Sequence, residues 1–214
     1  MTFRNIDMNT YARRKHFEYF TSMQYPYVGV TNNVDVTELV DYCKTKKYSF
    51  YLLFLHIAAL AAENVKELRY RIHNGGIIEY DECPTSHTEM MDNGTYCYCT
   101  LKHHMPVCEY MAYAEKEQKK CHTEGSLEED KDIESMYFIS SLPWLNYTAI
   151  IQPVACGEES NPRITWGKYE EDYKGRKQLP VTILAHHALV DGIHIAQFYE
   201  NIALEIEKVI SSQQ

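Results

Sequence analysis

The chain has 214 residues, of which 45% are hydrophobic and 13% aromatic, and 21 Lys and Arg against 30 Asp and Glu give it a formal net charge of −9. This length and composition favour one globular domain with a real core and exclude a disordered chain. No basic block offsets the negative charge, which argues against nucleic acid and anionic membrane surfaces as partners, although a few local Lys or Arg residues could still hold one anionic cofactor.

The compartment that we expect is the cytoplasm. The longest uncharged apolar stretch, Ser49 to Ala62, is too short to cross about 30 Å of hydrocarbon. Residues 1–10 lack a basic start followed by an apolar run, so they do not resemble a signal peptide. The seven cysteines show no CxxC framework, which favours free thiols in a reducing environment.

The first half of the chain is predicted to be mainly helical, with one turn beside a short strand. Asp35 has the spacing to Glu38 of a helix cap, and the Ala-rich run after Ser49 is too long for a strand and apolar on every face. Gly75-Gly76 marks a turn. We therefore predict a helix that opens at Asp35, a buried helix over Phe50–Val65, a turn between Leu68–His73 and Ile77–Tyr80, and a polar helix from Pro106 to about Gln118.

The middle of the chain allows two interpretations. In Thr95–Leu101 a period of two puts Cys97 and Cys99 on one face of a strand and two tyrosines on the other, which is typical of cysteines buried as small apolar residues. The alternative is zinc, for which seven candidate ligands are available, but their spacing matches no usual structural site. We therefore expect no metal among Cys97, Cys99, His103, His104, Cys108, Cys121 and His122.

The second half is predicted to consist mainly of strands, followed by one amphipathic helix. There is no repeat or linker, so residues 1–214 are assigned to a single domain. Without strict βαβ alternation, the fold class that we expect is a two-layer α/β (α+β) domain, with a mixed β-sheet and helices packed mainly on one face. The predicted elements are strands over Met136–Ser140 and Leu145–Gln152, a hairpin of Ile164–Tyr169 with Leu179–Ala185, and a helix from Ile193 to about Ile210.

The segment with the strongest chemical signal joins the last strand to the last helix. There His186 and His187 end an apolar strand, and alternation along the strand sends their side chains to opposite faces. Asp191 and Gly192 follow, and Asp191 alone has an ordinary explanation as a helix N-cap. Two histidines, an aspartate and a glycine in this register favour a catalytic turn.

This His-His-x-x-x-Asp-Gly pattern resembles the signature of the chloramphenicol acetyltransferase family, which dihydrolipoamide acyltransferase catalytic domains share. Four other stretches resemble motifs of the chloramphenicol enzymes, in the same order and with nearly the same spacing. The resemblance covers most of the chain and is weakest from about Pro84 to Ser135. These stretches are Arg13–Glu18, Glu67-Leu68-Arg69 with Ile72, Ser140–Trp144 and Thr165–Tyr169.

The resemblance implies roles for five residues in an acetyl transfer from acetyl-CoA. His187 would be the general base, with its other ring nitrogen donating to its own backbone carbonyl. Ser140 would donate a hydrogen bond to the oxyanion, and Thr165 would assist through a water. Arg13 and Asp191 would form a buried salt bridge that holds the active-site turn.

The resemblance also implies how acetyl-CoA, the co-substrate, is held. Lys168 would meet its phosphates and Tyr169 would stack on its base. The chloramphenicol enzymes often carry a Lys before Phe-Tyr, where this chain has Ser49. Lys46 or Lys47 could compensate, or acetyl-CoA binding could be weaker.

In the resembling family the protein is a homotrimer, and each site lies between two subunits. His187 would then face the neighbour's Ser140 and an acceptor pocket from that neighbour. Our candidates for this pocket are Phe20, Tyr25, Tyr27 and Tyr98, and the hydroxyls of the three tyrosines favour a more polar acceptor.

The leading hypothesis is an acetyl-CoA-dependent O-acetyltransferase that acts on chloramphenicol by direct transfer. The alternatives are an acyltransferase for a different, more polar alcohol, and a non-catalytic trimeric binding module. The sequence leaves open whether the role is antibiotic resistance or metabolism.

Overall fold

The computed structural model describes residues 1–91, 93–125, 131–155 and 158–211. Within these ranges the elements run, in chain order, β1 (Phe3–Asn5), α1 (Arg14–Thr21), β2 (Tyr27–Asp35), α2 (Thr37–Lys46), α3 (Phe50–Glu63), β3 (Tyr70–His73), β4 (Gly76–Tyr80), β5 (Thr85–Met90), β6 (Tyr96–Leu101), α4 (Val107–Glu124), β7 (Tyr137–Ser141), β8 (Arg163–Trp166), β9 (Glu170–Glu171), β10 (Lys177–His186) and α5 (Gly192–Ser211). Short 3₁₀ turns occupy Lys66–Arg69 and Ile133–Ser135.

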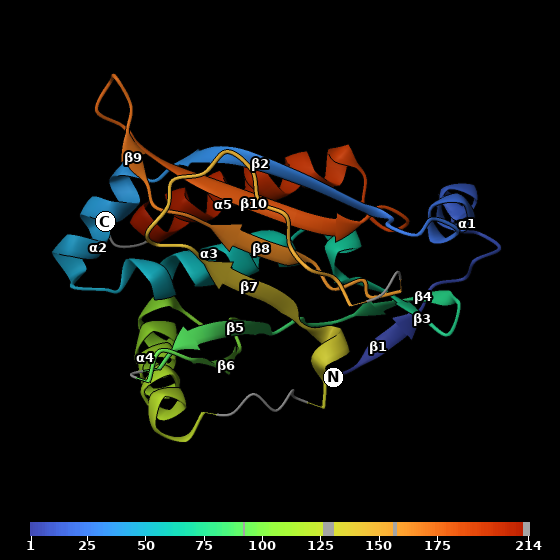
Figure 1. The fold of residues 1–214 in the computed structure, drawn as a ribbon, viewed down its shortest axis with the longest axis horizontal. Helices are drawn as coiled ribbons and strands as arrows, with labels where there is room; N and C mark the ends of the chain where they lie inside the picture. Colours follow the sequence, from blue (N-terminus) through green and yellow to red (C-terminus); the bar gives the residue numbers. More distant parts are fainter. Residues whose placement is uncertain (92, 126–130, 156–157, 212–214) are drawn as a thin grey trace.

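The main sheet has the order β2-β10-β8-β7-β5-β6, with β9 paired to the outer part of β10 (Figure 1). Its central strand β7 runs parallel to β5 and β8, and its other pairs are antiparallel. A small antiparallel sheet, β1-β4-β3, lies beside it. The predicted mixed sheet is therefore confirmed.

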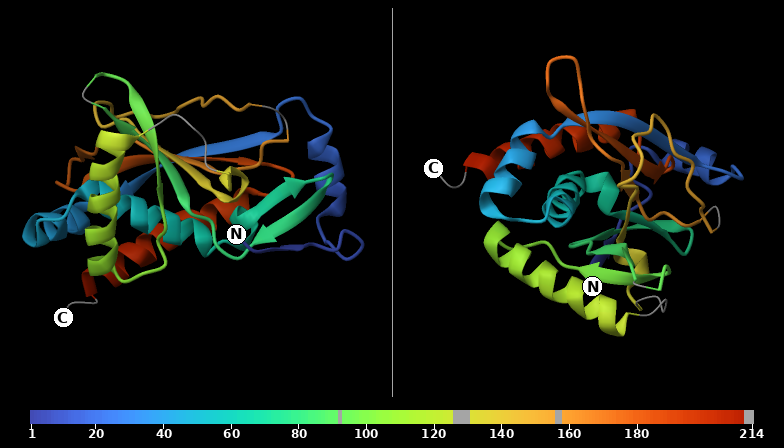
Figure 2. Two further views of the ribbon diagram at one scale, coloured as in Figure 1. Left: turned by 90° about the horizontal axis from the view of Figure 1, so that it is seen from below. Right: turned by 60° about the vertical axis from the view of Figure 1, so that its left-hand side comes forward.

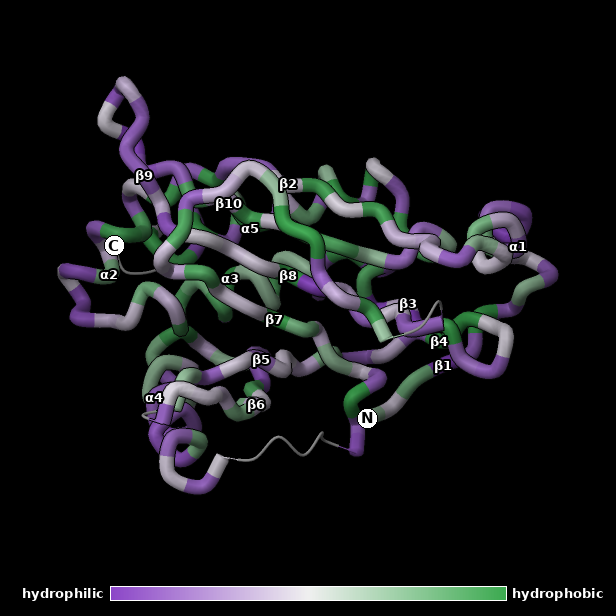
Figure 3. Tube along the Cα trace, viewed as in Figure 1, coloured by the Kyte–Doolittle hydropathy of each residue, from purple (hydrophilic) through white to green (hydrophobic). Residues whose placement is uncertain are grey.

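Helices α3 and α5 cover one face of the main sheet, as predicted. Helix α3 is apolar all round because it lies at the centre of the molecule, between the sheet, α2, α4 and α5 (Figure 2). Every second residue of β10, including Val181, Ile183 and Ala185, faces this core and is buried. Hydrophilic residues gather instead in the hairpin around β9 (Figure 3). None of the helices in the described ranges is long and apolar enough to cross a membrane.

Most predicted elements are present, with shifted ends. The N-cap of α2 is Val36 rather than the predicted Asp35, whose carboxylate nevertheless accepts hydrogen bonds from the backbone and hydroxyl of Thr37, the first residue of the helix. Helix α4 continues to Glu124, beyond the predicted end. In β6, Cys97 and Cys99 are buried on one face, as the period of two predicted. The six cysteines in the described ranges are free thiols.

The predicted strand over Leu145–Gln152 is wrong. Both edges of β8 are already paired, with β7 and β10, so the sheet offers this segment no partner there. The segment crosses instead over the face of the sheet opposite α3 and α5 (Figures 1 and 2). Gly167 lies directly beneath it, and a Cβ at this glycine would come within 2.4 Å of the Leu145 carbonyl. A glycine is therefore required for the close crossing.

Candidate active site

The turn after β10 places His187 at the edge of the main sheet. His186 ends the strand opposite Tyr27, and the backbone of His187 donates a hydrogen bond of 2.7 Å to the Pro26 carbonyl. The backbone N–H groups of Leu189 and Val190 donate to the His186 carbonyl, which closes a tight turn before α5. His186 is buried, whereas His187 is half-buried at the surface.

The His187 ring is held in one orientation and one tautomer. Its Nδ1 lies 2.9 Å from the Val190 carbonyl, and the Phe20 ring stacks on it with centroids 3.9 Å apart. A carbonyl only accepts hydrogen bonds, so Nδ1 carries the proton and leaves a lone pair on Nε2. The expected bond from the ring to its own carbonyl is absent, since that carbonyl accepts from Arg13 at 3.3 Å.

Arg13, just before α1, clamps the turn from outside. Its guanidinium donates to the carbonyls of Leu189, at 2.5 Å, and His187, and it lies 3.7 Å from the Asp191 carboxylate. The expected ion pair between Arg13 and Asp191 is present, with the Asp191 carboxylate half exposed in the single chain. A hydrogen bond from the Gly192 backbone, followed by the charge of Arg13, holds the pKa of Asp191 below its usual value.

The other predicted site residues lie along the middle of the sheet. Ser140 on β7 is in register with Thr165 on β8, which is in register with Thr182 on β10 and, beyond it, Thr31 on β2. Paired residues share a face, so the four hydroxyls form a row on the face opposite α3 and α5. Thr165 is fully buried under the crossing segment and accepts a hydrogen bond from the Gln152 side chain.

A cleft of about 1090 Å³ opens on this face beside Ser140. The row of hydroxyls continues into this cleft, because Thr88 on β5 and Tyr98 on β6 are paired and both line the cleft. Ser86 and Thr100, which are also paired, line it as well. His187 is not among the described residues that line the cleft. Ser140 lies two strands away from Thr182, and His187 comes five residues after Thr182 along β10 and its turn. With the usual strand spacing and rise, the Cα atoms of His187 and Ser140 in the same chain are therefore about 19 Å apart.

The four predicted pocket residues are divided between these two places. Phe20, Tyr25 and Tyr27 lie beside His187, where Tyr25 and Tyr27 have centroids 5.1 Å apart and Tyr27 is 5.2 Å from His186. Only Tyr98 lines the cleft that contains Ser140. The expectation of one pocket contributed by one subunit is therefore wrong, since β2 and β6 are at opposite edges of the main sheet.

Lys168 and Tyr169 follow β8 at the far end from the His187 turn. Lys168 is exposed, with its backbone fixed by the crossing segment through a 2.7 Å bond to the Leu145 carbonyl. Tyr169 is half-buried against Phe50, with centroids 5.9 Å apart. Ser49 begins α3 as its N-cap and accepts from the Leu52 backbone, so its hydroxyl has a structural task.

The residues weighed as zinc ligands fall into separate groups. Cys97 and Cys99 are buried, the Cys97 thiol donates to the Cys121 carbonyl at 3.4 Å, His122 contacts Glu89, and Cys108 is exposed. His103 and His104 lie beside Glu63 at the end of α3. No sequence signal joins Glu63 to two histidines forty residues away. Tyr147 and Gln152, which bond to Thr165, also went unnoticed, because their segment resembled a strand.

Comparison with known proteins decides the family. The family model described as chloramphenicol acetyltransferase matches residues 1–203. The chain belongs to the chloramphenicol acetyltransferase family. It is 25% identical over 213 residues to chloramphenicol acetyltransferase 2 of Escherichia coli, covering 98% of this chain and 100% of that one. It is 27% identical over 201 residues to the chloramphenicol acetyltransferase of Klebsiella sp, covering 92% and 90%.

A solved chloramphenicol acetyltransferase structure has the same fold, with a TM-score of 0.84 at 22% identity over 96% of this chain and all of that one. Membership of the chloramphenicol acetyltransferase family makes the protein an acyltransferase. The alternative of a non-catalytic binding module is therefore set aside.

Proposed function

We propose that the protein transfers the acetyl group of acetyl-CoA to a hydroxyl of chloramphenicol, with His187 as general base. The observation that carries the proposal is the fixed His187 ring: Nδ1 faces the Val190 carbonyl at 2.9 Å, so Nε2 can accept a proton. Stacking on Phe20 and the Arg13 clamp hold this ring and its turn in place.

In the proposed reaction the Nε2 of His187 takes the proton of the acceptor hydroxyl as its oxygen attacks the thioester carbon. The tetrahedral intermediate carries a negative oxygen, to which Ser140 donates a hydrogen bond. Thr165, buried next to Ser140 in the same row, supports the site from below. The intermediate then collapses: the carbon–sulfur bond breaks, the CoA thiolate takes the proton from His187, and the acetyl ester leaves.

The proposed site lies between two copies of the chain. A base about 19 Å from its own Ser140 cannot act on a carbonyl bound there, because proton transfer requires hydrogen-bond distance. Contact between the His187 edge of one copy and the cleft of the next is head-to-tail, and such contacts close into rings. A ring of three is the assembly that the family resemblance implies.

The crossing segment offers a surface for this contact. Trp144, Leu145 and Ile151 are exposed in one chain, Ile151 to 93%. Large apolar side chains that gather on one face mark interfaces between proteins. The segment lies over the same face of the sheet as the cleft, so a neighbour seated there would cover these side chains and reach Ser140.

For acetyl-CoA, the proposed contacts are Lys168 and Tyr169. The exposed ammonium of Lys168 is available to a phosphate, and Tyr169 presents the part of its ring that Phe50 leaves uncovered. Since Ser49 caps α3, the neighbouring Lys46 and Lys47 at the end of α2 supply the remaining positive charge.

A second acceptor class is favoured by the hydroxyl groups that stand on the mainly apolar surface of the cleft. Ser86, Thr88 and Thr100 line it together with Tyr98 and Ser140. A site rich in hydroxyls suits an alcohol that carries further hydrogen-bonding groups. The alternative substrate is therefore a more polar alcohol, acetylated by the same residues.

A thiol-release assay with acetyl-CoA tests the base directly. His187→Ala is expected to lower turnover with chloramphenicol by about 10²–10⁴-fold, the usual contribution of a positioned base. His122→Gln, a half-exposed histidine on α4, is the control and should keep full activity. Retained activity in His187→Ala would refute His187 as the general base. If the wild type releases thiol only with other alcohols, chloramphenicol is not the acceptor, but the proposed acetyl transfer still holds.

A further inference from the structure

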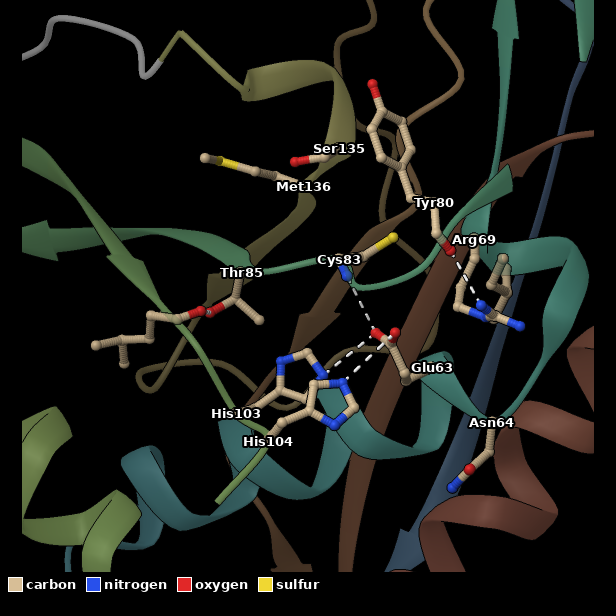
Figure 4. Close-up of polar contacts among 12 residues, drawn as sticks. Glu63, Asn64, Arg69, Tyr80, Cys83, Thr85, His103, His104, Ser135 and Met136 are labelled. Carbon is tan, nitrogen blue, oxygen red and sulfur yellow. Dashed lines mark hydrogen bonds and ion pairs between the residues drawn. The ribbon is translucent and has the colours of Figure 1, made fainter. Parts of the chain in front are cut away.

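A second histidine pair lies far from the His187 turn, where the end of α3 meets the connection between β6 and α4. The Nε2 of His103 lies 3.3 Å from one Glu63 oxygen and the Nε2 of His104 lies 3.6 Å from the other (Figure 4). These three ligand atoms all lie within 4.8 Å of one another. Two chain segments forty residues apart thus bring two imidazoles and a carboxylate to one point.

The polar atoms of this cluster are buried without adequate partners. Glu63 is 9% exposed and His103 only 1%, yet Glu63 Oε1 and both ring nitrogens of His103 make no hydrogen bond. The other oxygen of Glu63 accepts one bond of 3.3 Å, from the Cys83 backbone. Among the described residues, the two imidazoles are the only groups able to carry positive charge within 4.0 Å of this carboxylate. A cation bound between these three side chains would satisfy the polar atoms that now lack partners.

The spacing fits a bound ion better than it fits hydrogen bonds. Charge-assisted N–H···O bonds are usually about 2.7–2.9 Å long, shorter than both contacts here. With zinc–ligand bonds of about 2.0–2.1 Å, neighbouring ligands of a tetrahedral ion lie about 3.3–3.4 Å apart. The separations of the two Nε2 atoms from the nearer Glu63 oxygens, 3.3 and 3.6 Å, fall around that value.

A second carboxylate, Glu89, has side-chain hydrogen bonds that Glu63 lacks, although both ring nitrogens of His87 beside it also make no hydrogen bond. Glu89 also lies between two histidines, His87 at 3.2 Å and His122 at 3.4 Å. Its oxygens accept hydrogen bonds from Gln118 and His122. Burial acts to raise the pKa of Glu89, but the contacts with His87, Gln118 and His122 outweigh it and lower the pKa. Among the described residues, no side chain donates a hydrogen bond to Glu63. The Glu63 carboxylate therefore lacks the partners that the Glu89 carboxylate has.

We infer that Glu63, His103 and His104 bind a divalent transition-metal ion, for which Zn²⁺ is the best match. Two imidazole nitrogens and a carboxylate oxygen are ligands that zinc prefers, and three protein ligands leave a fourth position for water. A small cavity of about 10 Å³ lies beside His103 and His104, and the half-exposed His104 opens the cluster to solvent. The Sγ of Cys83 points away from the carboxylate and takes no part (Figure 4).

The bound ion would link the end of α3 to the segment that follows β6, through Glu63 on one side and the two histidines on the other. Strand β6 also carries Tyr98 and Thr100, which line the cleft. The sequence predicted no metal because the cysteines and histidines of this region lack zinc spacing. The ligand that sequence spacing does not reveal is Glu63 of α3, and the proposed site contains no cysteine.

The test is a titration of the metal-free full-length protein with Zn²⁺ by calorimetry. The wild type is expected to bind one ion per chain, and His104→Gln and Glu63→Gln to bind at least about tenfold more weakly. His122→Gln is the matched control, because its side chain is 47% exposed against 45% for His104 and also lies beside a glutamate. It should bind like the wild type.

Two further readouts complete the test. Zn²⁺ should raise the melting temperature of the wild type and His122→Gln, but not that of His104→Gln. Co²⁺ should give the visible bands of a four-coordinate ion without a thiolate charge-transfer band. If Glu63→Gln fails to fold, His104→Gln still tests the site, because the His104 side chain is half exposed. No binding by the wild type, unchanged affinity in His104→Gln, or a thiolate band would overturn the site.

Discussion

At the scale of single residues, Arg13 matters more to the active-site turn than its ion-pair partner does. Its guanidinium donates to two backbone carbonyls of the turn while only 19% exposed, whereas the Asp191 carboxylate is half exposed. A hydrogen bond to a charged group contributes about 1.5–3 kcal/mol, and an exposed ion pair only about 0.2–1 kcal/mol. The turn therefore depends mainly on the carbonyl contacts.

We accordingly predict that Arg13→Ala lowers the free energy of unfolding by about 1.5–3 kcal/mol and turnover by more than about tenfold, because His187 loses its fixed place. Asp191→Asn should cost less than about 1 kcal/mol and have a smaller effect on turnover. Urea denaturation and steady-state kinetics measure both. Equal losses in the two variants would show that the ion pair, not the carbonyl contacts, holds the turn.

At the scale of elements, the segment that crosses the sheet depends on the absence of a side chain at Gly167. A methyl group there would meet the Leu145 carbonyl at 2.4 Å and the Tyr147 ring at 3.0 Å. Tyr147 and Gln152 hold the segment on Thr165 from above. Lifting the segment would therefore also disturb the row that contains Ser140.

We predict that Gly167→Ala destabilises the protein by about 1–3 kcal/mol, the usual cost of overpacking, and reduces turnover as well. Gly76→Ala is the matched control, since its added Cβ would meet only the His73 carbonyl, at an ordinary 3.7 Å. Thermal unfolding compares the two. If Gly167→Ala were as stable and active as Gly76→Ala, the crossing segment would not need the close approach.

The sequence could predict those elements whose side chains alternate or repeat clearly. Cys97 and Cys99 alternate with tyrosines, and α3 is apolar on every face, so β6 and the buried helix were evident. Strand β5 was missed because its buried positions include Thr85, His87 and Glu89, which carry no apolar signal. The apolar Leu145–Gln152 run was assigned to the sheet because sequence does not show which strand edges remain free.

At the scale of the whole molecule, the predicted catalytic groups fall into two sets on one chain. Arg13, His187 and Asp191 form one at the end of β10, and Ser140 and Thr165 form the other in the middle of the sheet. The resemblance to a family identified both sets, but only the strand register shows how far apart they are. The separation of Tyr98 from the other three predicted pocket residues has a similar cause, because β2 and β6 lie at opposite edges of the sheet.

The most direct measurement of the central claim combines two variants that the proposed mechanism expects to have little activity alone, His187→Ala and Ser140→Ala. If each site joins His187 of one copy to Ser140 of the next, mixed assemblies contain sites in which both residues are intact. Random mixing in a closed head-to-tail ring predicts about a quarter of wild-type activity after co-expression. If the co-expressed variants are no more active than each variant alone, the site is not shared between copies.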